Sequence, residues 1–496
     1  MKKKLLFWID LVMIHFGLAY QLQQKLDDDF FAMIDTPNKP KKMFLNQKIV
    51  NFQKTWFFHD YIKKTNEKPD LEYLYNFERK YNIDLWKLAI NERHFYKFNR
   101  FYKFTSNEIL KFLEQECKLF ESVLDKINPN YFFLNEPPFH HQKLMMELCK
   151  AKGVKVLCLS QSGFDSNSII VENNSTFDLP QNLDLVKLTE SDKTQINQDG
   201  NNYNFNKLQK KWATERKIST LNKLKALKDY ILFSDSKNTQ SNYTYYGRSK
   251  NNVMSNTILF YIKRQFRYNF LQKNSKKILD LNVPFVYFPL GIDDDIALLH
   301  FAPFFTDQIE VIRHVAKSLP IDYKLFVKEH IHAGFRGWKN IKQYKEIKEI
   351  PNVIFIHPSY SSNELIKNSK LVITIRGSSS LEAAQQNKPS IVFDDTPYDI
   401  LPSVYKVKSV KELPQLIKMG LNTTIDPSYI KRYSKLIRER EVDFSGLDLE
   451  IIRNNYFFSG NILSDVEIQD NKVKEFLENT KEMFKILSDA HLEKIN

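Results

Sequence analysis

Residues 371–393 read LVITIRGSSSLEAAQQNKPSIVF, and this stretch decides the fold class. It joins an apolar run suited to a buried strand, a Gly-Ser-rich turn, a run of good helix formers and a second apolar run. This order is the repeating unit of a parallel sheet whose faces are both covered by helices. We therefore predict strands at 371–375 and 390–393, with a helix at 379–387 between them.

The same alternation continues on both sides of this stretch, from residue 284 to residue 421. Short apolar runs separate segments with helical spacing of apolar residues. The predicted strands are 285–290, 323–329 and 353–357, and the predicted helices are 307–319, 341–349 and 362–369. Residues 281–425 are thus expected to form one Rossmann-like domain, of the kind that binds a nucleotide.

A second α/β region is expected at the start of the chain, in residues 1–164. The predicted strands are 5–9, 30–34, 131–134 and 154–159, and the predicted helices are 107–127 and 141–152. Residues 165–280 are read as a polar connector that carries basic helices at 207–232 and 257–277, with a polar loop between them at 234–256. Residues 426–496 are read as charged helices. The predicted fold is two Rossmann-like domains facing a cleft.

Composition narrows the class of protein. With 496 residues, 42% hydrophobic and 27% charged, the chain can build two or three cores, and wholesale disorder is excluded. Lys and Arg outnumber Asp and Glu by 73 to 59, so a net charge of +14 should attract nucleotides, acidic sugars, nucleic acid or anionic lipid.

The apolar run after residues 2–4 is interrupted by Asp10 and His15, which favours a buried strand over a signal peptide or membrane span.

The cysteines favour a reducing compartment. Three are too few for a disulfide framework, and none lies at a metal-ligand spacing. They are Cys117, Cys149 and Cys158. We expect a cytoplasmic protein, with peripheral contact at the inner face of a membrane.

The turn after the strand at 371–375 is a candidate phosphate site. Its backbone N–H groups and hydroxyls precede a helix, whose N-terminus attracts anions, and Arg376 adds a positive charge. The alternative is that Ser379 and Glu382 form a capping box that only starts the helix. The residues assigned here to nucleotide binding are Arg376, Gly377, Ser378, Ser379, Ser380 and Glu382.

Three further residues, Lys328, Glu329 and His330, end the strand at 323–329 and should emerge at the same edge of the sheet. We assign them to nucleotide binding as well; the alternative is a surface salt bridge and a loop histidine. The triple aspartate at 293–295 has the form of a D-x-D metal motif, but a solvated loop is the favoured interpretation because its neighbours are basic.

Glu136 follows the strand at 131–134 and is the candidate catalytic carboxylate, as general base or nucleophile, with Asp295 in reserve. The alternative for Glu136 is a residue that only leads into the helix with His140 and His141. Because these histidines are merely adjacent, no metal is assigned. The basic aromatic segment 261–268 could bind nucleic acid or an anionic membrane, but a solvated helix face explains it as well.

At this point the sequence resembles the capsule polysaccharide biosynthesis family, which includes bacterial β-Kdo transferases. The resemblance is strong over 284–421 and weaker at NERHFYKF (91–98), PNYFFLNE (129–136) and VKVLCLS (154–160). It rests on VPFVYFPL at 283–290, APFFTDQIEVIRHVAKSLP at 302–320, YKLFVKEH at 323–330, NVIFIHPS at 352–359 and the stretch from ELIKNSK at 364 to 404.

The resemblance implies a GT-B-like glycosyltransferase that takes a sugar from a nucleotide donor, CMP-Kdo in the best-known members, without a metal or a further cofactor. It places His330 and the serines 378–380 around the CMP portion. The chain departs from the family pattern at Gly291, Asp294 and Ile331, where the family has His and Pro residues.

The predicted function is therefore transfer of a CMP-activated acidic sugar to a glycan or lipid-linked acceptor of a surface polysaccharide. The nucleotide sugar would bind to the domain at 281–425, and the acceptor to the domain at 1–164. Two other functions remain open: a CDP-polyol phosphate transferase, which a similar fold could host, and a non-enzymatic role as a scaffold in capsule assembly or a basic nucleic-acid-binding protein. No specific nucleic acid is expected as a partner.

Overall fold

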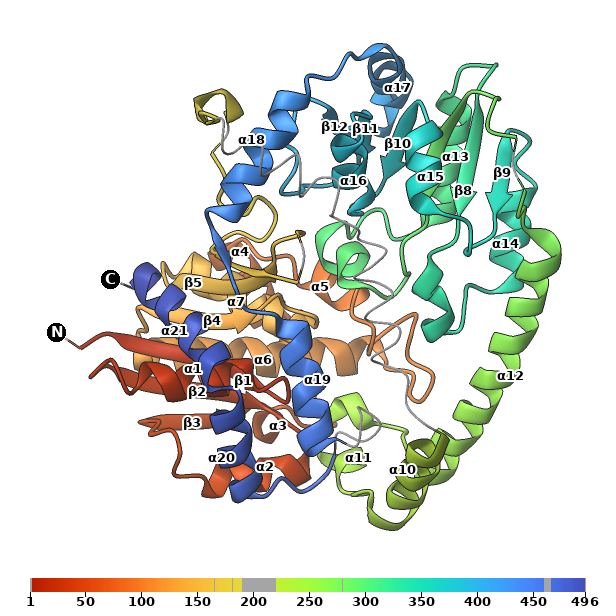
Figure 1. Ribbon diagram of the computed structural model, residues 1–496. Coiled ribbons are helices and arrows are strands. Elements are labelled where there is room, and N and C mark those ends of the chain that lie inside the picture. Colours follow the sequence, from red (N-terminus) through yellow and green to blue (C-terminus); the bar gives the residue numbers. More distant parts are fainter. Residues whose placement is uncertain are drawn as a thin grey trace. The chain divides into compact units, whose positions relative to one another are not determined.

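The computed structural model describes residues 2–164, 166–180, 182–189, 220–278, 280–458 and 465–495. The chain divides into two compact units (Figure 1). The first comprises the described residues among 1–174, 202–253 and 440–496, and the second those among 175–201 and 254–439. Each unit contains its own sheet, which confirms the prediction of two Rossmann-like α/β parts.

The sheet of the first unit has seven strands in the order β13-β6-β5-β4-β1-β2-β3. Strands β3, β2, β1, β4 and β5 are parallel, while β6 and β13 run antiparallel to their neighbours. The strands are β1 (Lys4–Asp10), β2 (Asp29–Asp35), β3 (Lys54–Phe57), β4 (Tyr131–Asn135), β5 (Lys155–Gln161), β6 (Ser168–Val171) and β13 (Glu441–Val442). The parallel strands thus follow the doubly wound order 3-2-1-4-5.

Alternation along β1 explains how helices cover both faces of this sheet. Leu5, Phe7 and Ile9 face a core built with α1, α20 and α21, whereas Trp8 packs on Phe58 of α3 and Phe120 of α6. The helices are α1 (Ile14–Leu22), α2 (Asn38–Asn46), α3 (Phe58–Tyr61), α4 (Leu71–Tyr81), α5 (Leu85–Ile90), α6 (Ser106–Ile127), α7 (His140–Ala151), α10 (Thr220–Phe233), α11 (Asn238–Ser241), α19 (Gly446–Phe457), α20 (Asp470–Asn479) and α21 (Lys481–Ile495).

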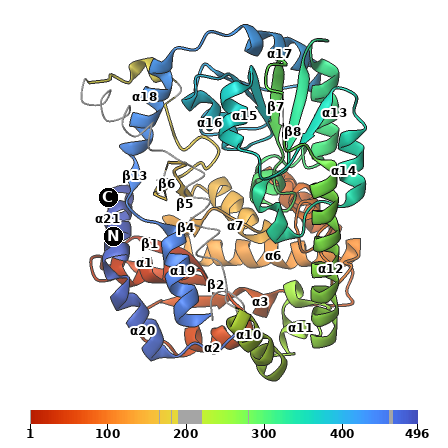
Figure 2. The same ribbon diagram turned by 45° about the vertical axis from the view of Figure 1, so that its right-hand side comes forward.

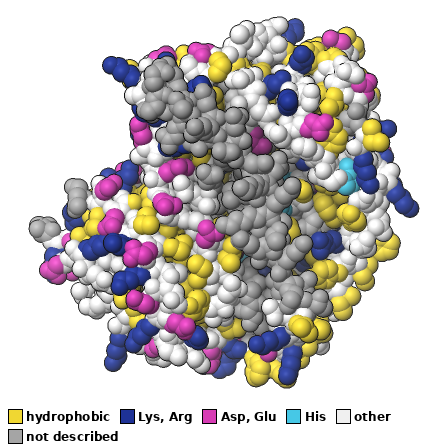
Figure 3. All heavy atoms as spheres, in the orientation of Figure 1, with side chains coloured by type: hydrophobic (Ala, Val, Ile, Leu, Met, Phe, Trp, Pro, Cys, Tyr) yellow, Lys and Arg dark blue, Asp and Glu magenta, His cyan; other side chains and the backbone are white. Residues whose placement is uncertain are grey.

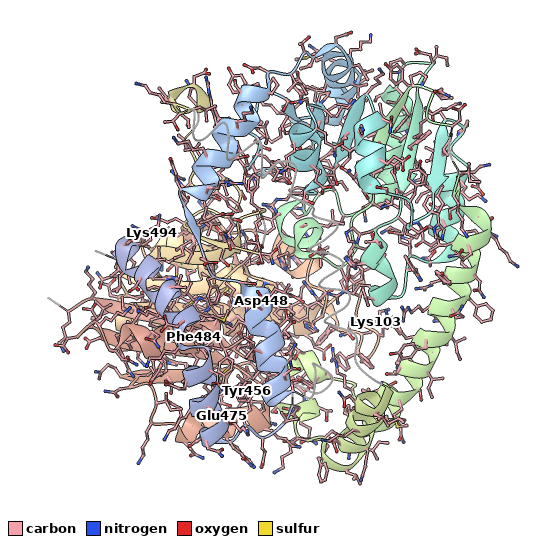
Figure 4. The ribbon with its side chains drawn as sticks, in the orientation of Figure 1. Lys103, Asp448, Tyr456, Glu475, Phe484 and Lys494 are labelled. Carbon is pink, nitrogen blue, oxygen red and sulfur yellow. The ribbon has the colours of Figure 1, made fainter. Side chains whose placement is uncertain are left out.

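The first and last helices of this unit pack closely together (Figures 1 and 2). Figure 4 labels Phe484 on α21. A Cβ atom built on Gly17 of α1 would lie 2.2 Å from the ring of Phe484, so only glycine leaves room for this aromatic side chain. The chain therefore completes the core of its first βα unit with a helix from its last fifty residues.

The sheet of the second unit is entirely parallel, in the order β12-β11-β10-β7-β8-β9. Numbered within the unit, this is the order 6-5-4-1-2-3 of a doubly wound dinucleotide fold. The strands are β7 (Phe285–Pro289), β8 (Lys324–Lys328), β9 (Val353–Ile356), β10 (Leu371–Thr374), β11 (Ser390–Val392) and β12 (Val404–Lys406). Strands β7 and β10 are neighbours at the point where the strand order reverses, the edge at which such folds bind ligands.

Two hydrophobic clusters cover the two faces of the second sheet. Val286 and Phe288 pack with α13, α14 and α17, while Phe285 and Tyr287 pack with α15 and α16. The helices are α12 (Lys250–Asn274), α13 (Gln308–Ser318), α14 (Ile341–Lys348), α15 (Ser362–Asn368), α16 (Ser379–Gln385), α17 (Leu413–Asn422) and α18 (Pro427–Arg438). The short 3₁₀ or π segments along the chain are Leu183–Leu185, Tyr243–Tyr245, Ala297–Phe301, Ile331–Arg336 and Val410–Glu412.

Three sequence predictions about the connecting segments need correction. The polar loop predicted at 234–256 contains α11 and the first turns of α12, because the asparagine-rich start of α12 carries no apolar periodicity. The predicted connector contributes β6, and the predicted C-terminal helices contribute β13, so both stretches add strands to the first sheet. Of the helix predicted at 207–232, residues 207–219 lie outside the described part; the rest is α10.

The surface mixes charges of both signs. On the face shown in Figure 3, Lys and Arg side chains alternate with Asp and Glu side chains rather than forming a patch of one sign. Within the described ranges, no helix combines the length and apolar character needed to cross a membrane.

Candidate functional site

The turn at 376–380, called the serine turn below, follows β10 in the second unit. The N–H of Gly377 donates to Oγ1 of Thr374 at 3.1 Å, and a Cβ at Gly377 would lie 2.6 Å from that oxygen. Arg376 donates from Nε to the carbonyl of Asp395 at 2.9 Å, and its guanidinium lies 3.7 Å from the centroid of the Phe301 ring. These contacts hold the turn in one conformation at the edge where β7 and β10 meet.

The start of α16 differs from the predicted capping box. Ser378 is the N-cap residue, Ser379 is the first helical residue, and no side chain in the described structure caps this helix. Glu382 instead accepts a hydrogen bond from Oγ of Ser378 at 3.0 Å. The capping-box alternative is therefore wrong, and the N-terminal N–H groups of α16 are not taken up by a cap side chain.

Ser380 occupies a different environment from its two neighbours. Its side chain is fully buried, and its Oγ lies 2.6 Å from Oγ of Ser390 on β11. This contact ties α16 to the sheet. Ser378 and Ser379, in contrast, are partly exposed.

Lys328 lies beside the serine turn. Its Nζ donates to Oγ of Ser362 at 2.6 Å, its side chain is buried, and its charge interacts with Glu382. Burial lowers the pKa of Lys328 to about 8, although the carboxylates of Glu382 and Glu329 oppose this shift. The structure thus brings Lys328 together with Ser378 and Glu382, three residues that the sequence assigned to one site from two separate segments.

His330 follows Lys328 and is held in a defined orientation. Its Nδ1 accepts the backbone N–H of His332 at 3.1 Å, so the proton of the neutral ring lies on Nε2. Burial lowers the pKa of His330 to about 4, and the charges of Lys328 and Lys339 contribute to the shift. Near neutral pH this imidazole is therefore an uncharged donor.

Glu329 belongs to a buried cluster that sequence reasoning missed, formed by Asp293, Glu329, Lys339 and Tyr344 and called the Lys339 cluster below. Nζ of Lys339 lies 2.6 Å from Oδ1 of Asp293, and Tyr344 donates to Oε2 of Glu329 at 2.6 Å. Burial by itself lowers the pKa of Lys339, but the carboxylates of Asp293 and Glu329 outweigh burial and raise it. Burial also raises the pKa of Glu329. The residues fix the loop after β7 to the loop after β8.

The triple aspartate is only partly the solvated loop that was predicted. Asp293 pairs with the buried Lys339, and Asp294 lies 3.4 Å from Arg336. Asp295 is exposed and accepts the backbone N–H of Ile296 at 2.7 Å. The prediction is wrong for Asp293, because a lysine distant in sequence reaches it.

Glu136 lies in the first unit, at the end of β4. Its N–H donates to the carbonyl of Leu159 at 3.1 Å, and its side chain is partly buried and interacts electrostatically with Cys158. It lies at the point where the order of the first sheet reverses between β1 and β4, which is the ligand-binding edge of such a sheet.

The first unit also holds a buried network of titratable residues, called the histidine cluster below. It consists of Asp35, His59, Glu92, Glu116, His140, His141 and Tyr243. His140, fully buried, lies 3.0 Å from Glu92 through Nδ1 and 3.0 Å from Glu116 through Nε2. Burial by itself lowers the pKa of His140, but the two carboxylates outweigh burial and raise it to about 10.

Asp35 organises the other half of this cluster. It accepts hydrogen bonds from Nε2 of His59 at 2.9 Å and from Nε2 of His141 at 3.0 Å. Burial by itself raises the pKa of Asp35, but these two histidines hold it well below its usual range. Nδ1 of His141 is then left to accept the hydroxyl of Tyr243, 2.9 Å away. The adjacent histidines, and Glu92 within the stretch NERHFYKF, were visible in the sequence, but no site role was assigned to Glu92 or to Glu116 of α6.

Comparison with known proteins supports the resemblance inferred from the sequence. The model of the family described as "Capsule polysaccharide biosynthesis protein" matches residues 204–402, which include β7 to β11 and the serine turn. The chain therefore resembles this family over residues 204–402, and the match reaches upstream of the stretch recognised above. No curated protein matches.

Solved structures match this chain only at low sequence identity and with low TM-scores. Two structures of Thermosulfurimonas dismutans KpsC are among them. The beta Kdo 2,7 transferase matches at 10% identity over 64% of this chain and 79% of that chain, with a TM-score of 0.30. The beta Kdo 2,4 transferase matches at 11% identity over 62% of this chain and 79% of that chain, with a TM-score of 0.33. The UDP-GlcNAc 2-epimerase of Methanocaldococcus jannaschii matches at 13% identity over 88% of this chain and 100% of that chain, with a TM-score of 0.25.

Proposed function

We propose that this protein is a glycosyltransferase of surface polysaccharide biosynthesis that uses a nucleotide sugar bound in its second unit, with a CMP-linked acidic sugar as the favoured donor. The observation that carries the proposal is the family match over residues 204–402, which contains the serine turn, Lys328 and His330. A glycan or a lipid-linked glycan would be the acceptor. The net charge of +14 suits an anionic donor and an anionic product.

The chemistry that such a site must supply is stabilisation of a leaving nucleotide phosphate. Lys328 offers a positive charge, and Nε2 of His330 offers a neutral donor. The N–H groups at the start of α16 offer further donors, apart from that of Ser380, which donates to the carbonyl of Gly377 at 3.3 Å. Because these groups are held by Ser362, by His332 and by the serine turn, they need little reorganisation as charge develops. This set of donors supports departure of the phosphate without a cation at the same place.

A carboxylate must also activate the acceptor or receive the sugar, and Glu136 is the proposed residue. It lies at the reversal point of the first sheet, where a ligand of that unit would bind. Asp295 is the reserve candidate, since it is exposed beside the loop that follows β7.

Nucleotide titration tests the donor site. Purified protein should bind CMP or CDP in preference to UDP and GDP without added metal, and the binding should be lost in Ser379→Ala and in His330→Ala. Ser318→Ala and His314→Ala on α13 are matched controls and should bind as the unaltered protein does. Equal weak binding of all four nucleotides, or none, would remove the donor-site assignment.

Lys328 predicts a dependence of nucleotide affinity on pH. Because its pKa is about 8 in the absence of ligand, it loses its charge between pH 7 and 9.5, whereas His330, with a pKa of about 4, stays neutral over that range. The affinity for CMP should fall by up to about tenfold as the pH rises, the size of one charge-assisted hydrogen bond.

Lys328→Arg is the control for this titration. An arginine stays charged at pH 9.5, so the variant should bind CMP with an affinity that changes little with pH. A decline of the same size in both proteins would show that another group is responsible.

A further inference from the structure

Three potential metal ligands converge inside the histidine cluster. One ligand atom each from Glu116, His140 and His141 lies within 4.8 Å of the other two, and all three residues are buried. The closest pair, Nε2 of His140 and a carboxylate oxygen of Glu116, is 3.0 Å apart. Ligands about 2.0–2.2 Å from a tetrahedral metal ion lie somewhat more than 3 Å from each other, so a small outward adjustment makes room for an ion.

A second observation concerns the far side of each histidine ring. Nδ1 of His140 lies 3.0 Å from Glu92, and Nε2 of His141 lies 3.0 Å from Asp35. Each ring therefore gives one nitrogen to a carboxylate and turns the other toward the point shared with Glu116. This is how metal-binding histidines are oriented: an outer carboxylate fixes the ring and increases the basicity of the ligand nitrogen.

The outer carboxylates are themselves anchored. Glu92 also accepts the backbone N–H of His140 at 2.8 Å, and Asp35 also accepts from His59 at 2.9 Å. The Tyr243 hydroxyl lies 2.9 Å from Nδ1 of His141 and interacts with Glu116 as well, so it provides a further oxygen at the same point. Glu92 and Glu116 are buried and the side chain of Asp35 is 14% exposed, so three carboxylates concentrate negative charge here, and such charge needs a compensating partner.

We propose that Glu116, His140 and His141 bind a structural zinc ion in the first unit, with the Tyr243 oxygen completing the ligand set. Imidazole nitrogens with a carboxylate are a ligand set that Zn²⁺ accepts, and a site without an exposed ligand is of the closed, structural kind. This site lies in the other unit from the proposed donor site and is independent of it.

Binding exchanges one cation for another. Without metal, a proton lies between Nε2 of His140 and Glu116; Zn²⁺ takes its place, and the proton leaves to solvent. The hydroxyl of Tyr243 stops donating to His141, whose Nδ1 lone pair turns to the ion, and donates to Glu116 instead. No oxidation or reduction takes place.

Metal analysis of the full-length protein, purified without chelator and dialysed, tests the proposal. We expect about one equivalent of zinc, a lower melting temperature after chelation, and recovery on adding Zn²⁺. Co²⁺ added to the chelated protein should give the visible absorption bands of a tetrahedral site. Protein that holds no zinc and does not respond to added Zn²⁺ or Co²⁺ would overturn the proposal and leave a network held by protons.

Two variants locate the ion, and a third serves as control. Glu116→Gln removes a ligand and should abolish stoichiometric binding. Glu92→Gln keeps all ligands but loses the orienting charge, and should weaken zinc affinity by about 10- to 100-fold while the protein still folds. Glu310→Gln, at an exposed ion pair on α13, should bind zinc as the unaltered protein does. Unchanged affinity in Glu92→Gln or in Glu116→Gln would place the zinc elsewhere and overturn the assignment.

Discussion

Replacing Lys339 by methionine is expected to lower the free energy of unfolding of the second unit by about 3–5 kcal/mol, because removing one member of a buried ion cluster leaves its partners uncompensated. The side chain of Lys339 is 4% exposed and lies 2.6 Å from Asp293. Its charge also acts on Glu329, which is fully buried. Methionine fills a similar volume, so the loss reports the charge rather than a cavity. Urea unfolding measures it.

The loss should depend on pH. Burial already raises the pKa of Glu329, and removing Lys339 raises it further. Above the ordinary carboxyl pKa, the unfolded chain has released this proton, so the variant must bind a proton in order to fold, and this becomes less favourable as the pH rises. The variant should therefore lose more stability relative to the unaltered protein at pH 8 than at pH 5. Adding Glu329→Gln should recover part of the stability at pH 8.

Lys342→Met is the matched control. Lys342 lies three residues further along the same segment, its side chain is 87% exposed, and it is 4.0 Å from Glu346. A surface pair of this kind contributes at most about 0.5 kcal/mol. Suppose that Lys339→Met lowered the free energy of unfolding by no more than Lys342→Met does. The carboxyl groups of the cluster would then be protonated in the folded state, and the assignment of an ion cluster would be wrong.

The substitution Gly17→Ala should also change the free energy of unfolding strongly. It should lower this free energy, whereas the sequence alone suggests that it would raise it. In an exposed helix, alanine in place of glycine adds about 0.5–1 kcal/mol of stability. Here the new Cβ would lie 2.2 to 2.4 Å from ring atoms of Phe484. We expect a loss of about 1–3 kcal/mol from overpacking, and a larger loss for Gly17→Val.

A double-mutant cycle isolates this contact. Phe484→Leu reduces the side chain and should lower stability by itself, but Gly17→Ala should cost less in its presence than in the unaltered protein. Gly446→Ala is the control, because its Cβ would find only Ile14 at an ordinary 3.8 Å. Additive losses for Gly17→Ala and Phe484→Leu would mean that α1 and α21 do not touch at this point.

The sequence predicts nine of the eleven parallel strands that the structure describes to within one or two residues, because each of the nine is a short apolar run next to a turn or a predicted helix. It does not predict β3, β6, β12 or β13, which have two to four residues and lie at or near the sheet edges, where the apolar pattern is weak. The pairing of β13 with β6 joins residues more than 270 positions apart, so no local pattern encodes it.

In the candidate site, too, the residues that end predicted strands were found from the sequence, and those placed by tertiary structure were not. Lys328 and the serine turn each end a strand of one sheet, and the topology brings them together as predicted. Lys339 lies in a loop with no motif, and its burial depends on where Asp293 and Glu329 are placed by tertiary structure. Glu92 and Glu116 were missed for the same reason: Glu92, in the loop after α5, and Glu116, on α6, become internal acids only when the tertiary structure covers them.

The return of the last helices to the first sheet has a consequence for how the protein is made. The contiguous part of the second unit, residues 254–439, emerges from the ribosome before β13, α20 and α21 emerge. It can therefore fold while α1 still lacks α21 and β6 still lacks β13. Until residues 440–495 emerge, the apolar face around Gly17 is uncovered on the nascent chain, and this is the interval in which a holdase chaperone would find a binding surface.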